Sequence, residues 1–178
     1  MSFIEPDGES VNRSFTIDKA LDDELMQEAQ KKRISVSTLL SQLVNKYLNF
    51  HRYNHNRNYI NMGNNTLKTL MENMDEDKLY ECGYTMGGEN PISRLFRAGL
   101  KPGKESLLIY LKTLDFYANW FTCEEKTIDE IKYIYIDHNH GLLWSRFLEG
   151  YFNGIFDKLD LTAEITRHGK CFLIHLKK

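Results

Sequence analysis

A short strand followed by two helices opens this sequence, and these elements cannot bury their own apolar side chains. Residues 12–17 alternate polar and apolar side chains, and Phe15 and Ile17 fall on the apolar face. Asp18 is a residue type that caps helices, and apolar residues recur at helical spacing over 19–32. The strand has no partner of its own in this region. We therefore expect two chains to pair their strands into an antiparallel ribbon, with four helices closing over its apolar face.

The second helix is expected to begin with a serine cap, at Ser35 or Ser37, after a break near residues 32–34. Beyond that point large apolar residues recur at the three- and four-residue spacing of a helix that buries one face. This stripe consists of Leu39, Leu40, Leu43, Val44, Tyr47 and Leu48.

The polar face of such a ribbon would have the chemistry needed to read bases. A two-stranded ribbon fits the major groove of DNA, where asparagine can pair with adenine and serine or threonine can bond to several base edges. Alternation places Asn12, Ser14 and Thr16 on the face opposite Phe15 and Ile17. The sequence therefore predicts these three residues as base contacts and double-stranded DNA as the partner.

Phosphate contacts are expected around the start of the second helix, whose free backbone N–H groups and positive dipole end favour an anion. The expected contacts are Arg13, Lys32, Arg33, Ser35 and Ser37. Local charge agrees with this expectation. Residues 10–60 hold eight Lys and Arg against five acids, although the whole chain has a net charge of −2.

Residues 10–50 resemble the MetJ/Arc/CopG superfamily of ribbon-helix-helix repressors. The resemblance rests on the alternating strand, the capped first helix and the run from Ile34 to Val44. It implies a sequence-specific transcriptional regulator that acts as a homodimer or higher homo-oligomer, with its ribbon in the major groove. Family members usually have glycine in the turn where this chain has Arg33, so a left-handed backbone there would carry strain. Alternatives are an antitoxin-like or other protein-interaction module, and a small-ligand-binding protein whose N-terminal module only dimerises.

The rest of the chain predicts a second domain, so the overall fold class is α+β. Residues 51–65 are rich in Asn and are expected to be a linker or an extension of the second helix, and 66–178 form the second domain. Its predicted helices and strands follow in order. They are helices over 66–74 and 76–86, a break at 87–91, helices over 92–98 and 105–121, a strand over 126–137, a helix over 142–159 and a hairpin of 161–166 with 171–176.

The second domain concentrates aromatic residues on its last two long helices. Trp120, Trp144, Phe147 and Tyr151 belong to a plain core or line an apolar ligand pocket, which would admit a small apolar effector. Glycines at 150 and 154 favour close approach of another helix. The order of elements is similar to that of 4-vinyl-reductase/heme-NO-binding-like domains, some of which bind small hydrophobic ligands or cofactors. We expect a domain for ligand sensing, oligomerisation or both.

Other functions find little support in the sequence. No phosphate-binding loop, nucleophile elbow or paired-carboxylate motif indicates an enzyme, so no catalytic residue is predicted. The pairs His51/His55 and His138/His140 are expected to be solvated or capping residues rather than metal ligands, and no cofactor is predicted. The three cysteines are far apart and are expected to be buried thiols. The absence of a signal peptide or long apolar run predicts a cytoplasmic protein without membrane contact.

Overall fold

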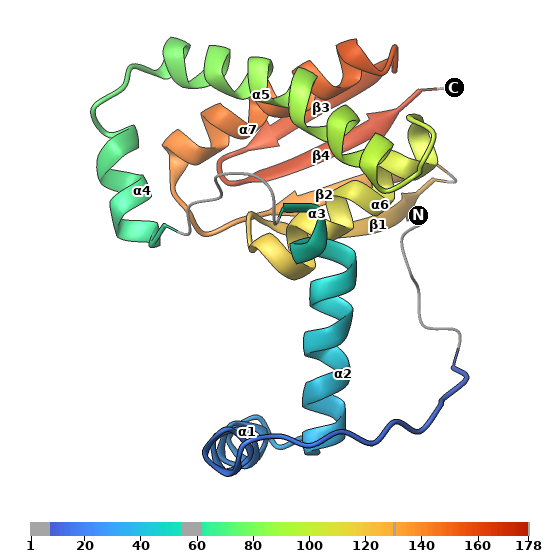
Figure 1. Ribbon diagram of the computed structural model, residues 1–178. Helices are drawn as coiled ribbons and strands as arrows, with labels where there is room; N and C mark the ends of the chain where they lie inside the picture. The colour runs from blue at the N-terminus through green and yellow to red at the C-terminus, as the bar shows by residue number, and fades with distance from the viewer. Residues whose placement is uncertain (1–7, 55–61, 130, 178) are drawn as a thin grey trace. The chain divides into compact units, whose positions relative to one another are not determined.

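The computed structural model of the protein describes residues 8–54, 62–129 and 131–177 (Figure 1). The chain divides into two compact units. One is Phe3–Arg57, and the other is Asn58–Lys178 together with Met1–Ser2. Helices and one antiparallel sheet make the fold mixed α+β, as the sequence predicts. In the part of the chain that the structure describes, no helix is long and apolar enough to cross a membrane.

The N-terminal unit contains two helices with the predicted caps. They are α1 (Lys19–Lys31) and α2 (Val36–Lys46), followed by the π-helical turn η1 (Tyr47–His51) and α3 (Arg52–Asn54). The Asp18 carboxylate accepts a hydrogen bond from the Ala20 N–H at 2.9 Å, and the Ser35 hydroxyl accepts one from the Thr38 N–H at 3.0 Å. Each bond satisfies an N–H group that has no carbonyl partner within its helix, which fixes where the helix begins.

The segment before α1 forms no strand within the described part of the chain. A ladder of interstrand hydrogen bonds needs a second strand, and the predicted partner is the same segment of another chain. Pairing of residues 12–17 therefore stays a prediction. In the turn between α1 and α2, Arg33 adopts the left-handed conformation with φ of 55°.

The C-terminal unit consists of helices followed by two hairpins that flank a long helix. The helices are α4 (Asn64–Met71), α5 (Glu76–Arg97), α6 (Lys104–Thr113) with its π-helical end η2 (Leu114–Ala118), and α7 (Leu142–Lys158). The strands are β1 (Thr122–Ile128), β2 (Ile131–Asp137), β3 (Ala163–His168) and β4 (Cys171–Leu176). Helix α3 and the start of α4 thus occupy parts of the segment predicted as a linker or helix extension.

The four strands form one antiparallel sheet in the order β1-β2-β4-β3. Alternation gives each inner strand one buried face, which carries Ile134 and Ile136 on β2 and Phe172 and Ile174 on β4. Helix α7 packs against this face, and the ring of its Phe152 lies 5.4 Å from that of Phe172, centre to centre. The core of the unit therefore lies between the sheet and its covering helices, and α6 adds residues such as Leu107 and Leu111 to it.

Helices α5 and α7 approach each other through glycines (Figure 1). A Cβ atom built on Gly83 or Gly87 would lie 2.0 Å from the carbonyl oxygen of Phe147 or Tyr151 on α7. A Cβ built on Gly150 or Gly154 would lie 2.1 Å from a carbonyl oxygen of α5. The prediction that the α7 glycines admit a neighbouring helix is thus confirmed, and α5 contributes a matching pair.

Three sequence predictions for this unit are wrong. The break over 87–91 does not occur, because α5 continues through it with Gly87 and Pro91 buried. The single strand over 126–137 is two strands joined by a tight turn in which Asp129 is left-handed, with φ of 49°. The helix over 105–121 ends at residue 118, because Asn119 is also left-handed. By contrast, α7 and the β3–β4 hairpin with its turn at Gly169 are confirmed.

Candidate functional site

The N-terminal unit presents the predicted base contacts on a solvent-exposed segment. Asn12, Ser14 and Thr16 are all exposed. Phe15, which the alternation places on the opposite face, is also 64% exposed in the single chain, and Ile17 is half-buried. The described chain leaves the side chains on both faces of this segment accessible to a partner.

The predicted phosphate contacts gather mainly at the α1–α2 turn. Arg33 lies in the turn, Ser35 caps α2 and Ser37 follows in its first turn, and all three are exposed. The Ser35 hydroxyl is engaged with the Thr38 N–H, so the first-turn amides of α2, rather than this hydroxyl, are the donors left for an anion.

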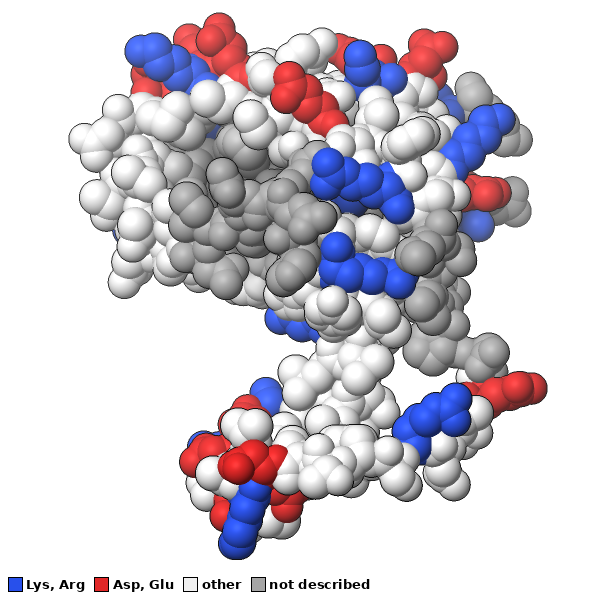
Figure 2. Space-filling model, viewed as in Figure 1, with Lys and Arg blue, Asp and Glu red and all other residues white. Residues whose placement is uncertain are grey.

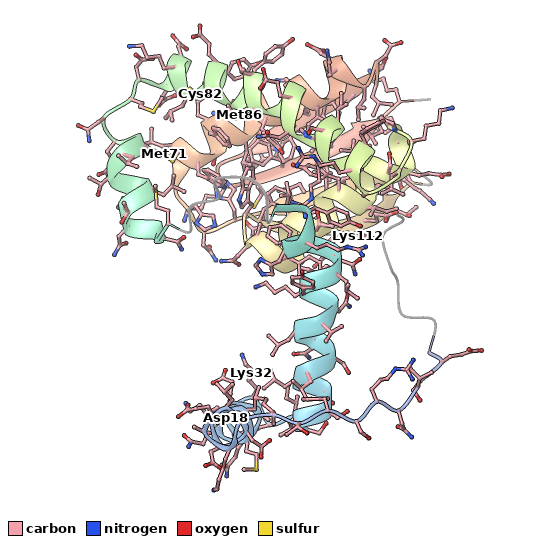
Figure 3. The ribbon with its side chains drawn as sticks, in the orientation of Figure 1. Asp18, Lys32, Met71, Cys82, Met86 and Lys112 are labelled. Carbon is pink, nitrogen blue, oxygen red and sulfur yellow. The ribbon has the colours of Figure 1, made fainter. Side chains whose placement is uncertain are left out.

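The two remaining predicted phosphate contacts have other neighbours. The ammonium of Lys32 forms an ion pair of 3.3 Å with Glu28 on the preceding turn of α1 (Figure 3). Arg13 stands apart on the extended segment, where its guanidinium donates a long hydrogen bond to the Asn12 carbonyl. The turn therefore brings together four of the five predicted phosphate contacts, and among the described residues Arg33 is the one of its cations without an ion pair.

The C-terminal unit contains a cavity of about 640 Å³. Its wall comes from α4, α5, the connection after η2 and the first turns of α7. The structure places Trp120, Trp144 and Phe147 in this wall, as the pocket alternative predicts. Tyr151 lies in the core instead, where it is fully buried and its hydroxyl bonds to that of Tyr110. The volume falls within the usual range for small-molecule sites.

Sulfur is the feature of this cavity that the sequence analysis missed. Four of the six methionines of the chain line it, together with one of the three cysteines. These residues are Met62, Met71, Met74, Cys82 and Met86. Figure 3 labels Met71 on α4 and Cys82 and Met86 on α5. The four-residue spacing of Cys82 and Met86, which puts both on one helix face, was the signal available in the sequence.

Polar groups in the cavity wall are few. They belong to Asn64, Asn90, Asn119 and His140, and no Lys, Arg, Asp or Glu is found among the described lining residues. Nε2 of His140 lies 2.9 Å from the Asn119 carbonyl oxygen, which can only accept, so Nε2 carries the proton. Such a wall suits an uncharged, largely apolar molecule with one or two hydrogen-bonding groups.

Next to the cavity, His138 is buried in a fixed tautomer. Its Nδ1 accepts a hydrogen bond from the His140 N–H at 3.3 Å, so its Nε2 donates to the Ser145 hydroxyl at 3.0 Å. Burial, followed by the neighbouring His140, lowers the pKa of His138 to about 4. The neutral imidazole is therefore a structural link between the end of β2 and the start of α7.

The three cysteines differ in environment, which corrects the expectation that all are buried. Cys82 is exposed, Cys171 is half-buried and Cys123 is buried. Burial, reinforced by the nearby Asp115 carboxylate, raises the pKa of the Cys123 thiol to about 12. Across the described residues, no three His, Cys, Asp or Glu side chains are placed to hold a metal ion together.

No protein-family model matches this chain, and neither the curated proteins nor the solved structures contain a match to it.

Proposed function

We propose that this protein is a sequence-specific, DNA-binding transcriptional regulator that acts as a homodimer. In this proposal the N-terminal unit is a ribbon-helix-helix module. The observation that supports it most is the exposed apolar face of that unit in the single chain. Phe15 is 64% exposed, Leu43 48% and Val44 56%, and only Ala29 and Leu39 are buried in α1 and α2. A second chain would cover this face.

The same pairing would create the DNA-binding surface. Once Phe15 and Ile17 are covered by the helices of two chains, Asn12, Ser14 and Thr16 face outward from the ribbon. Arg33 occupies the left-handed position of the turn, where glycine would be less strained. An arginine at this position places a cation beside the start of α2, where it would attract a phosphate.

The cavity supports a sensing role for the C-terminal unit. We propose that a small, uncharged, largely apolar effector binds between α4, α5 and α7, because the wall is aromatic and sulfur-rich and carries no charged residue in the described set. Both tryptophans of the chain, Trp120 and Trp144, line this cavity. Their fluorescence therefore reports directly on occupancy.

We further propose a cytoplasmic location. All three cysteines are free thiols, which is the state expected in a reducing compartment.

The cavity also favours a second candidate function, a small-ligand-binding protein whose N-terminal unit only dimerises. The two candidates differ in one measurement, which is the capture of genomic DNA fragments by the intact protein at moderate salt. A regulator enriches a small set of related sequences. A ligand-binding protein enriches none, although its tryptophan fluorescence still changes when an apolar ligand binds.

Substitutions then test how the DNA is read. Asn12→Ala is expected to weaken binding to the preferred site by about 1–3 kcal/mol and to relax selectivity at one base position. Arg33→Ala should weaken all duplexes alike and lower the slope of log affinity against log salt by about one unit. Lys31→Ala, at the exposed end of α1, is the control for loss of one charge. Equal effects of Asn12→Ala on preferred and unrelated duplexes would contradict the proposed reading of bases.

A further inference from the structure

A stretch of the C-terminal unit carries positive charge without any acid. Residues 90–104 contain four Lys or Arg and no Asp or Glu, in a chain whose net charge is −2. In Figure 2 the Lys and Arg side chains on the facing side of this unit gather over the C-terminal half of α5 and over α6. Three of the four, Arg97, Lys101 and Lys104, are exposed, and we call these three the basic segment.

A chain reversal brings the basic segment together. Arg97 ends α5, Gly99 then adopts a left-handed backbone with φ of 71°, and Lys104 begins α6. Within the described part of the chain, none of the three cations has an acidic partner within 4.0 Å. Lys104 makes a single long hydrogen bond of 3.5 Å, to the Leu176 carbonyl. Their charge is therefore available to a ligand in solution.

Several cations elsewhere in the same unit are paired with acids. Lys78 lies 3.1 Å from Asp75, Lys126 lies 3.3 Å from Glu124, and Lys68 lies 3.8 Å from Glu72. The basic segment differs from these lysines because no nearby carboxylate offsets the repulsion among its three cations.

Helix stability does not account for this placement. A cation at the C-terminal end of a helix is favourable, which explains Arg97. Lys101 lies in the connection, outside both helices, and Lys104 stands at the positive end of α6, where a cation is unfavourable. A sequence selected for the stability of these helices would not place a lysine at residue 104.

We propose that the basic segment binds the phosphate backbone of double-stranded DNA, as a contact surface separate from the N-terminal unit. The proposal rests on the DNA-binding function proposed above. An anionic membrane is the competing ligand, because Phe96 beside Arg97 is 79% exposed. Among described residues 90–104, however, Phe96 is the sole exposed large apolar side chain. Binding to a membrane interface scales with the apolar area inserted, and one side chain supplies little.

The test compares two triple variants of the full-length protein that lose the same charge. One is Arg97→Gln, Lys101→Gln and Lys104→Gln. The matched control is Lys68→Gln, Lys78→Gln and Lys126→Gln, which removes the paired cations described above. Affinity is measured across a salt series for a duplex selected by the intact protein and for an unrelated duplex of equal length. Thermal melting checks that both variants remain folded.

Each phosphate contact contributes about 0.9 to the slope of log affinity against log salt, so the basic-segment variant should lose about two to three units on both duplexes. The control variant should keep the slope of the unchanged protein. Equal slopes for the two variants would overturn the proposal.

A second measurement separates DNA from membranes. Cosedimentation is measured with vesicles of phosphatidylserine and phosphatidylcholine. Binding to vesicles that the basic-segment substitutions abolish, with the DNA slope unchanged, would assign the surface to membranes instead. If the intact protein retains no duplex at any salt, both this proposal and the regulator function fail. If it retains duplex with an unchanged slope in the basic-segment variant, this proposal fails alone.

Discussion

Replacing Gly87 by Ala is the sharpest test of the α5–α7 contact. The added Cβ atom would lie 2.0 Å from the carbonyl oxygen of Tyr151, 2.8 Å from its carbonyl carbon and 3.0 Å from its Cα. All three are backbone atoms of α7, so no side chain can rotate away. Relief requires the two helices to separate by roughly 1 Å, if an ordinary carbon–oxygen contact is about 3.2 Å.

Two opposing effects set the size of the expected change. Alanine favours the helix over glycine by about 1 kcal/mol. Overpacking in a close-packed core costs about 1–3 kcal/mol, and occasionally more. Here the clash involves backbone on both sides, and separation of the helices also loosens the contacts around Gly83, Gly150 and Gly154. A backbone-on-backbone clash belongs above the usual range, so we take its cost as about 3–4 kcal/mol. Subtracting about 1 kcal/mol for the helix preference, we expect Gly87→Ala to lower the free energy of unfolding by roughly 2–3 kcal/mol.

The adjacent residue provides a matched control. A Cβ atom on Gly88 would meet its nearest heavy atom, the Gly154 carbonyl oxygen, at 3.8 Å, which is an ordinary contact. Gly88→Ala should therefore raise the free energy of unfolding by about 0.5–1 kcal/mol through helix preference alone. Urea unfolding followed by the fluorescence of Trp120 and Trp144 measures both variants. A Gly87→Ala protein as stable as Gly88→Ala would refute the close approach of α5 and α7.

Three further predictions concern the other features. Phe15→Ala should weaken the dimer by about 2–4 kcal/mol, because this side chain is exposed in the single chain and each chain would bury its own copy on dimerisation. Sedimentation over a dilution series measures this change. Ser14→Ala is the control and should leave the stability of the dimer unchanged. Folding lowers the pKa of His138 from its usual value near 6.5 to about 4. The contribution of the neutral imidazole to the free energy of unfolding is therefore complete above pH 6.5 and is lost as the pH falls towards 4. Between pH 7 and 5.5 this loss should be about 1 kcal/mol in chemical unfolding, and His138→Asn should remove that part of the pH dependence. An uncharged aromatic probe such as naphthalene should quench the tryptophan fluorescence saturably, and Phe147→Asp should abolish the effect; unsaturable quenching would indicate collisions in solution rather than a site.

The elements that could be predicted are those in which local signals agree. Asp18 and Ser35 are good caps followed by periodic apolar residues, so both helices of the N-terminal unit begin as expected. The β3–β4 hairpin has alternating strands around Gly169, whose φ of 62° suits a tight turn. In each case the residue that fixes the boundary lies beside it in the sequence.

The elements that were missed depend on contacts between distant residues. Gly87 and Pro91 both disfavour a helix locally, yet α5 is continuous because its glycines admit α7. The β1–β2 turn was hidden because Ile128 and Ile131 continue an apolar run on both sides of it. The aspartate at residue 129 was the available signal in the sequence, because aspartate tolerates the left-handed conformation it adopts there better than most residues do.

The candidate sites also contain parts that could be predicted from the sequence and parts that could not. The aromatic part of the cavity wall could be predicted from the density of rings on one stretch of chain. The sulfur-rich part could not, because Met71, Met74 and Cys82 meet the aromatic residues only through the packing of α4 and α5 against α7. The helix end and helix start around the basic segment were predicted, at residues 98 and 105, and lie close to the observed ones. That no acid of another element lies beside these cations depends on the fold and could not be predicted.

The strand order β1-β2-β4-β3 has a consequence for how the C-terminal unit acquires its structure. Each outer strand is joined to its inner neighbour by a short turn, so both hairpins can form within about 1–10 μs of the start of folding. The two inner strands, by contrast, are separated in the chain by the whole of α7. Their pairing closes a long loop that contains α7, and the same helix packs its glycines against α5 in the folded unit. We therefore expect closure of the sheet and docking of α5 to follow the hairpins and to be the slow steps in folding of the unit.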